Sequence, residues 1–351
     1  MKLATYKDGS RDGQLVVVSR DLGQACFATG TATRLQQVLD DWNFMSPQLQ
    51  DLYVALNQGK ARHAFAFDTR QCMAPLPRAH QWVEGLAYLN HRDLLHPAGS
   101  APLPDKLRGE PLLGQRGSDD FLGPCDEAWF GSEAWGIDFS AELAVITGDV
   151  EMGASPGEAL DGVRLLLLAN GWTLREFVPA EQARCSGGVQ SRPTTAFSPV
   201  AVTPDELGEA WRGGRLHLTL QSSWNGKKVG LSEAGPEMSF HFGQLIATLA
   251  KTRKLRAGSL VGSGTVSHKD PARGYHCIAE KRALETRAQG EPRTGYLVTG
   301  DSIRIEMKGR DGLSVFGAID QRVSAPADPS APAAGPADAP AASDGADHIR
   351  P

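Results

Sequence analysis

The sequence predicts a mainly β protein with some helices, on the basis of two observations. Residues 76–323 form many short runs in which apolar and polar residues alternate, and "WNGKK" (224–228) and "GRDG" (309–312) have the composition of hairpin turns. Residues 1–75 combine short β patterns with an amphipathic stretch at 33–59, which predicts one or two helices. We therefore expect a small N-terminal α+β domain followed by a larger, mainly antiparallel β domain.

Two further segments complete this organisation. The stretch "SFHFGQLIATLAKTRKL" (239–255) has apolar residues at helical spacing and basic residues near its end, which predicts a helix whose dipole is complemented there. Residues 324–351 are rich in Ala, Pro, Gly and Asp, with no large apolar residue before Ile349. Such a composition cannot offset the entropy of ordering, so we expect a disordered tail.

Composition excludes several classes of function. The chain has 351 residues, 41% of them hydrophobic, and a net charge of -5, with no basic run interleaved with aromatic residues. Nucleic acid is therefore not an expected partner. The first residues resemble no secretory leader, and no apolar stretch approaches membrane-spanning length, so we expect a cytoplasmic protein with no membrane partner.

The cysteines indicate reduced, mostly buried thiols. There are five, an odd number, and no two form a CxxC pair, which argues against disulfides and zinc. Cys125 in "GPCDEAW" is a weaker candidate for a nucleophile, because no Cys-His signature surrounds it.

One strand has a pattern suited to binding a cation. In "GIDFSAELAVITGDV" (136–150) apolar residues alternate with Asp138, Ser140 and Glu142, as expected for a half-buried strand with Ser140 and Glu142 on one face. Two acids at that spacing would lie about 7 Å apart and could converge on a hard cation. Only Glu142 offers a carboxylate here.

Two other segments offer candidate residues. In "QWVEGLAYLNHRDLL" (81–95), Glu84 and His91 would share one face if the segment were helical, although a lone histidine is usually structural. The stretch "GSGTVS" (262–267) follows an apolar strand but lacks the Lys-Ser/Thr of a P-loop, so we expect a turn that exposes Thr265.

A polar loop and a buried run complete the candidates. Asp119 and Asp120 in "LLGQRGSDDFLGP" fit a solvated turn better than a paired acid and base. The run "VRLLLLANGWTLREF" (163–177) ends in Asn-Gly and then presents Arg175. It fits either the floor of a site or a simple Asn-Gly turn.

Together these segments resemble the fumarylacetoacetate hydrolase family over roughly residues 76–323. The resemblance is carried by "YLNH" (88–91), "GSDDFLGP" (117–124), "GIDFSAELAVITGDV" (136–150), "QSRPTTAFSPVAVTPDELG" (190–208), "GSGTVSHKD" (262–270) and "CIAEKRALET" (277–286). "GSDDFLGP" and "AFSPVAVTPDELG" are similar to the bacterial two-domain branch. The resemblance implies a β-roll catalytic domain behind a small N-terminal domain, a homodimer, and hydrolysis of a C–C bond in a 1,3-diketo acid, with some members acting as decarboxylases or isomerases.

The resemblance also implies a catalytic apparatus. A divalent cation chelates the diketone and stabilises the enolate released by cleavage, while a histidine backed by a glutamate acts as general base on water. The histidine corresponds to His91, the supporting glutamate to Glu280, the guanidinium to Arg175 and the loop threonine to Thr265. The expected contacts with substrate further include Gln115, Asp119 and Gln190.

The metal positions depart from the family pattern. The first ligand, an aspartate in the family, corresponds to Glu84. The Glu-x-Glu pair corresponds to Ser140-Ala-Glu142, and the last aspartate to Gly171. Two of the four carboxylates are therefore missing, so Mg²⁺ or Mn²⁺ would bind at best weakly through Glu84 and Glu142.

Two more positions depart from the pattern in a way that suggests an alternative. The site lysine corresponds to Arg192, and the loop tyrosine to Gly114. In one alternative, Arg175 and Arg192 supply the positive charge, in a pocket widened by Gly114 and Gly171.

We expect an enzyme acting on a small oxo or dioxo acid by C–C hydrolysis or a related reaction, with weakened or absent metal dependence. The base is His91, supported by Glu280, and Arg175 and Arg192 bind the substrate anion. The alternatives are a repurposed metal-independent cyclisation, isomerisation or decarboxylation, and a catalytically inactive binding homologue.

Overall fold

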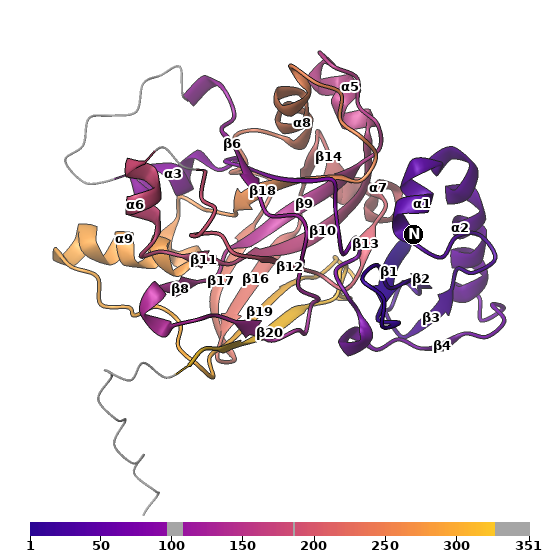
Figure 1. Cartoon of the computed structure of the whole chain (residues 1–351), viewed down its shortest axis with the longest axis horizontal. Coiled ribbons are helices and arrows are strands. Elements are labelled where there is room, and N and C mark those ends of the chain that lie inside the picture. The colour runs from indigo at the N-terminus through magenta and orange to yellow at the C-terminus, as the bar shows by residue number, and fades with distance from the viewer. Residues whose placement is uncertain (97–107, 185–186, 327–351) are drawn as a thin grey trace, which may run out of the picture.

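The computed structural model describes residues 1–96, 108–184 and 187–326, and its framework is a large mixed sheet (Figure 1). The strands of this sheet follow the order β4-β3-β2-β1-β13-β10-β9-β18-β5-β6, with β12 pairing to β10. Their bounds are β1 Lys2–Tyr6, β2 Gln14–Val18, β3 Gln24–Phe27, β4 Phe65–Ala66, β5 Gln81–Gly85, β6 Leu113–Arg116, β9 Ala141–Thr147, β10 Val163–Gly171, β12 Thr195–Phe197, β13 Ala201–Val202 and β18 Ser259–Thr265.

A second sheet has five strands in the order β17-β16-β19-β20-β7. Its strands are β7 Ala128–Trp129, β16 Thr219–Trp224, β17 Lys227–Glu233, β19 Ser302–Met307 and β20 Ile319–Ser324. Two short pairs stand apart, β8 Ile137–Asp138 with β11 Thr173–Leu174, and β14 Trp211–Arg212 with β15 Arg215–Leu216. Both hairpin predictions are confirmed, since Asn225 and Gly226 turn with positive φ between β16 and β17 and residues 309–312 turn between β19 and β20.

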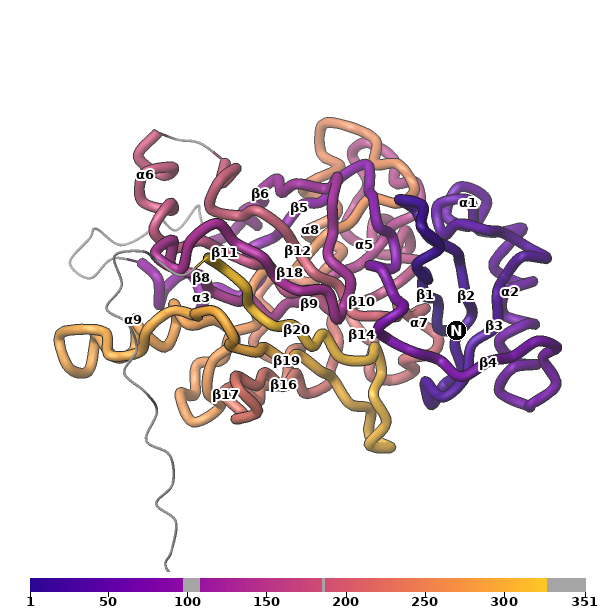
Figure 2. Tube along the Cα trace, turned by 60° about the horizontal axis from the view of Figure 1, so that its bottom comes forward, coloured from indigo at the N-terminus to yellow at the C-terminus, as the bar shows by residue number. Residues whose placement is uncertain are grey.

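The helices lie mostly at the two ends of the molecule and over the sheet. They are α1 Leu35–Asp40, α2 Trp42–Asn57, α3 Leu89–Leu95, α5 Pro156–Asp161, α6 Val178–Ala183, α7 Pro204–Leu207, α8 Phe242–Ala250 and α9 Ile278–Gln289. Figures 1 and 2 show the N-terminal segment with α1 and α2 at one end, and α6 and α9 at the other. The helix predicted over 239–255 is present but shorter, because it ends at Ala250.

The N-terminal segment continues the large sheet. Strands β1 to β4 form an antiparallel series, and β1 pairs with β13 through Lys2 opposite Val202 and Leu3 opposite Ala201. The amphipathic stretch at 33–59 forms two helices, separated at Asp41. Leu35, Val38 and Leu49 are among the residues that these helices bury. The mainly β prediction with a small α+β segment at the start is therefore confirmed.

The middle strands are buried on both faces. Every residue of β9 is buried, including Glu142 at 0% exposure. Strands β10 and β18 pair with its two edges, and packed protein covers both of its faces. The prediction of a half-buried strand was therefore wrong, although Ser140 and Glu142 do share one face. The Asn-Gly pair at 170–171 makes no turn, since both residues lie within β10 and pair with other strands.

The segment around Glu84 and His91 is not one helix. Glu84 lies on strand β5, and His91 lies on the short helix α3. Residues 81–85 are extended because they pair with β18 on one side and β6 on the other, which overrides the helical spacing. The two residues are therefore placed by different elements.

The cysteines are mostly buried, as the sequence predicted. Cys26, Cys72 and Cys277 are free and buried, whereas Cys125 is half-buried; Cys185 lies outside the described residues. No helix in the described part of the chain is long and apolar enough to cross a membrane. The predicted tail at 324–351 falls almost wholly outside the described residues, apart from 324–326.

We predict that Gly262→Ala lowers the free energy of unfolding by about 1–3 kcal/mol, the usual cost of overpacking. A Cβ on Gly262 would collide with the ring of Trp82, which is fully buried and donates its indole N–H to Thr195 Oγ1 at 3.0 Å. Urea denaturation measures the change. Gly30→Ala is the matched control, because nothing lies within 4 Å of its added Cβ. Equal stability of the two variants would contradict the packing argument.

Candidate functional site

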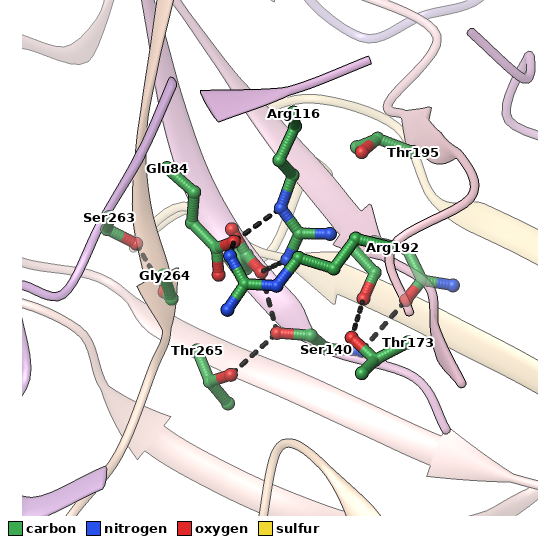
Figure 3. Close-up of polar contacts among 12 residues, drawn as sticks. Glu84, Arg116, Ser140, Thr173, Arg192, Thr195, Ser263, Gly264 and Thr265 are labelled. Carbon is green, nitrogen blue, oxygen red and sulfur yellow. Dashed lines mark hydrogen bonds and ion pairs between the residues drawn. The ribbon is translucent and has the colours of Figure 1, made fainter. Parts of the chain in front are cut away.

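Four neighbouring strands place polar side chains in one buried cluster. In the order β6-β5-β18-β9 they contribute Arg116, Glu84, Thr265 and Glu142. All four side chains are buried within the protein. Ser140, just before β9, joins the same cluster (Figure 3).

Arg116 lies between the two carboxylates and was not predicted from the sequence. Its Nε donates a short hydrogen bond to Glu84 Oε2, and its Nη2 lies 3.7 Å from Glu142 Oε1. Only 3% of the side chain is exposed. Sequence reasoning selected Gln115, which is exposed. The period-2 alternation of a strand could have indicated Arg116, but only after the register of β6 against β5 was known.

Arg192 is the second guanidinium of the cluster. It lies just before β12, and its Nη1 donates to Glu84 Oε2 at 3.0 Å. Figure 3 shows Arg116 and Arg192 reaching Glu84 from two directions. The Arg192 side chain is 34% exposed, so this arginine joins the buried cluster to solvent.

Two glycines allow these arginines to approach. A Cβ on Gly171 would lie 2.6 Å from Glu142 Oε1 and 3.0 Å from Arg116 Nη2, and a Cβ on Gly114 would lie 3.2 Å from Arg192 Nη1. One alternative from the sequence was that these glycines widen a pocket. Instead, the guanidinium groups of Arg116 and Arg192 fill the space beside them.

Thr265 belongs to the cluster and is not in an exposed turn. It ends β18, is 4% exposed, and its Oγ1 lies 2.6 Å from Ser140 Oγ. Ser140 Oγ in turn donates to Glu142 Oε1 at 2.7 Å. The expected turn was wrong because Gly264, at φ +71°, forms a local irregularity within the strand, which keeps pairing to β9 through Thr265.

His91 and Glu280 form a buried dyad beside this cluster, since the backbone N–H of Ala141, between Ser140 and Glu142, donates to His276 O, four residues before Glu280. His91 Nδ1 lies 2.8 Å from Glu280 Oε1, and both side chains are at most 10% exposed. This contact leaves Nε2 as the ring nitrogen that can exchange a proton with substrate or water. Asn90, next to His91, donates to Ser267 Oγ at 2.7 Å, two residues after Thr265, and so ties α3 to the end of β18.

Cys277 adjoins the dyad. Ligand atoms of His91, Cys277 and Glu280 lie within 4.8 Å of one another, the one such grouping among the described residues. Burial raises the pKa of the Cys277 thiol well above its ordinary value. These three groups could therefore hold a metal only if the ion displaced the thiol proton.

Arg175 is anchored by a carboxylate that the sequence reasoning did not select. Its Nε donates to Asp138 Oδ2 at 2.8 Å, and Asp138 also accepts the backbone N–H groups of Ile278 and Ala279. Asp138 therefore holds both Arg175 and the first turn of α9, where Glu280 lies.

The other predicted residues lie at the surface. Asp119 and Gln190 are exposed. The backbone N–H of Gln190 donates to Glu181 Oε1 at 2.7 Å. Within the described ranges, no hydrogen bond joins the side chains of Asp119, Gln190 or Gln115 to the buried cluster.

The charges of the two glutamates differ. Burial alone would raise the pKa of Glu84, but the positive charges of Arg116 and Arg192 outweigh it and hold that pKa well below its ordinary value. Burial, and then the negative charge of Glu84, raises the pKa of Glu142 to about 8. Near neutral pH the cluster thus has two guanidinium cations and one carboxylate.

These residues do not fit a divalent cation. The Arg116 guanidinium donates to Glu84 and adjoins Glu142, the two carboxylates that would have to bind the ion. Gly171 offers no side chain, so only these two carboxylates are left, and Arg116 adjoins both. A hard cation needs several oxygen ligands and is repelled by a guanidinium at this distance.

Comparison with known families identifies the chain. Residues 1–78 match the model described as fumarylacetoacetase N-terminal domain 2, and residues 81–324 match the fumarylacetoacetate (FAA) hydrolase C-terminal model. The chain therefore belongs to the fumarylacetoacetate hydrolase family, as the sequence resemblance predicted. No curated protein sequence matches the chain significantly.

Solved structures share this fold at low identity. Fumarylacetoacetate hydrolase from psychrophilic Exiguobacterium antarcticum is 18% identical with a TM-score of 0.63. Maleylpyruvate hydrolase from Sphingobium sp. SYK-6, in complex with manganese(II) ion and pyruvate, is 15% identical with a TM-score of 0.62. 2-Hydroxyhepta-2,4-diene-1,7-dioate isomerase from Mycobacterium marinum is 14% identical with a TM-score of 0.56. Each alignment covers 93% of this chain and 99% of the other.

We predict that stability depends on pH through Glu142. The pKa of this group is raised on folding from 4.5 to about 8, so its contribution to stability is fully present below the unfolded value and is lost as pH rises through the folded value. Glu142→Gln keeps a neutral side chain, so its unfolding free energy should fall less than that of the parent between about pH 5 and 8. Urea denaturation across this range is the measurement.

Glu151→Gln serves as the control, because Glu151 is 73% exposed. It should keep the pH profile of the parent. Identical profiles for the parent and Glu142→Gln would show that Glu142 is already ionised when folded.

Proposed function

We propose that this protein is an enzyme that acts on a small oxo or dioxo acid by C–C bond hydrolysis or a related reaction, without requiring a divalent metal. The observation that carries the proposal is the buried His91–Glu280 dyad beside a cluster containing two arginines. The fold supports it, because the neighbours with this architecture are named as hydrolases and isomerases of such acids. A cytoplasmic homodimer is part of the same proposal.

The dyad supplies the base. Glu280 holds the His91 ring through Nδ1 and stabilises the imidazolium that forms when Nε2 takes a proton. In hydrolysis His91 removes a proton from water, and the water oxygen bonds to one carbonyl carbon of the substrate. The adjacent C–C bond breaks, and its electron pair forms an enolate. The proton held by His91 then returns to the enolate carbon, so that one water is consumed and two products leave.

The arginines supply the recognition of the acid. Arg192 uses Nη1 on Glu84, and Arg175 uses Nε on Asp138, so each guanidinium retains other N–H donors for a substrate carboxylate. Both side chains are partly exposed, at 34% and 16%. An anion entering from solvent would meet these two groups before the buried Arg116.

A second candidate function is metal-independent isomerisation, decarboxylation or cyclisation of an oxo acid. The poor fit to a metal is compatible with these reactions too. They need a base and a group that stabilises an enolate, and, unlike hydrolysis, they consume no water. A catalytically inactive binding homologue is the remaining alternative. It would keep the anion-binding arginines and show no turnover.

We predict that His91→Asn lowers kcat/KM by about 10²–10⁴-fold, the usual contribution of a general base. The loss follows because the amide cannot take a proton from water or substrate. The measurement is the loss of enol absorbance with a panel of 2,4-dioxo acids, together with calorimetric binding of the same acids, which should change little.

The matched control is His80→Asn, which alters an exposed histidine and should behave as the parent. Full activity in His91→Asn would refute the assignment of the base. If the parent binds the acids but turns none over, the inactive alternative is supported. If the parent neither binds nor turns over any of them, the proposed function is wrong.

A further inference from the structure

We propose that Arg116 is a built-in electrophile, a buried guanidinium that replaces a divalent cation and binds the oxyanion of a 2-oxo acid or its enolate. This inference rests on the proposed function and names the group that receives the negative charge. It is carried by the position of Arg116 between Glu84 and Glu142, by the lack of a side chain at Gly171, and by a buried donor of Arg116 that has no partner.

Arg116 and Arg192 give the cluster a permanent positive charge. Arg116 is 3% exposed and contacts both carboxylates that remain from the metal-binding pattern. A guanidinium stays protonated in proteins, so its charge is permanent. With Arg192 on the same carboxylate oxygen, the cluster contains two fixed positive charges, the formal charge of one divalent ion.

Gly171 leaves space beside Arg116 and Glu142. An aspartate at position 171 would place its Cβ 3.0 Å from Arg116 Nη2 and 2.6 Å from Glu142 Oε1, with a carboxylate beyond it. A side chain at 171 would therefore displace Glu142 first and also crowd the Arg116 guanidinium. Gly171 leaves room for both groups, so the present position of Arg116 is compatible with the lack of a side chain there.

The cluster leaves one buried hydrogen-bond donor of Arg116 unpaired. Arg116 Nη1 is buried and has no hydrogen-bond partner. Buried donors without partners are rare and costly, so this one indicates a place for a polar ligand. The Nη1 donor belongs to a side chain that is more than nine-tenths buried.

The two arginines match the two neighbouring oxygen groups of a 2-oxo acid. A 2-oxo acid or its enolate presents a carboxylate next to a carbonyl or enolate oxygen. Arg192, which is open to solvent, suits the carboxylate, and the deeper Arg116 suits the neighbouring oxygen, where charge increases during the reaction. Arg116 forms no covalent bond and transfers no proton. It stabilises the electron pair that the substrate places on that oxygen.

Oxalate provides a direct test, because it is a planar dianion that resembles the enolate of a 2-oxo acid. Calorimetry of the metal-free parent, prepared with a chelator, should show oxalate binding, and adding Mn²⁺ should not tighten it. Arg116→Met should weaken oxalate binding at least tenfold. The control Arg78→Met, at a side chain that is 50% exposed, should bind as the parent does.

A second variant covers the case in which Arg116→Met does not fold. The triple variant Arg116→Ser, Ser140→Glu, Gly171→Asp restores four carboxylates, and it should bind Mn²⁺ at least tenfold more tightly than the parent by electron paramagnetic resonance. In this variant oxalate should bind only when Mn²⁺ is present. Absence of any gain in Mn²⁺ affinity in the folded triple variant would overturn the inference.

The outcomes separate the inference from the proposed function. Oxalate binding by the parent only in the presence of Mn²⁺, or unchanged binding in folded Arg116→Met, overturns the role of Arg116 and leaves an oxo-acid site in place. If the parent binds oxalate neither with nor without Mn²⁺, and binds none of the 2,4-dioxo acids, the oxo-acid site itself is wrong.

Discussion

The ion pair between Arg116 and Glu84 determines the character of the whole site. Both groups are buried, and each would be costly to bury alone, because the desolvation of an isolated charge exceeds what neutral surroundings return. Breaking such a pair typically costs about 3–5 kcal/mol, because the remaining charge is left without compensation. The pair therefore constrains each position that touches it, and these positions lie on β5, β6, β9 and β10 and just before β12.

The glycines at 114 and 171 show how that constraint acts. Neither has a positive φ, so neither is required by the backbone conformation. A Cβ at 171 would collide with the Glu142 carboxylate and crowd Arg116, and a Cβ at 114 would crowd the Arg192 guanidinium. In a close-packed interior, a buried guanidinium fits only where neighbouring side chains leave volume for it. The same reason explains why arginine side chains fill the space beside these glycines.

Much of the fold could be predicted from the sequence, and part of the site. Alternation and turn composition are local properties, so the β character and both hairpins could be read directly. His91 and Glu280 were paired through family motifs, because 188 intervening residues give no local signal of their contact. Arg116 could not be chosen over Gln115, because the face of a strand depends on its register with partners far away in sequence. Glu84 shows the same limit, since its helical spacing to His91 was overridden by pairing with β18 and β6.

Asp138 has a consequence that reaches beyond Arg175. One carboxylate accepts from the Arg175 guanidinium and from two amides that open helix α9, so these three donors share a fixed set of lone pairs. The Arg175 guanidinium and the start of the helix that bears Glu280 therefore share one anchor. The placement of this cation relative to the His91–Glu280 dyad is set by a single carboxylate, so a change at Asp138 would release both at once.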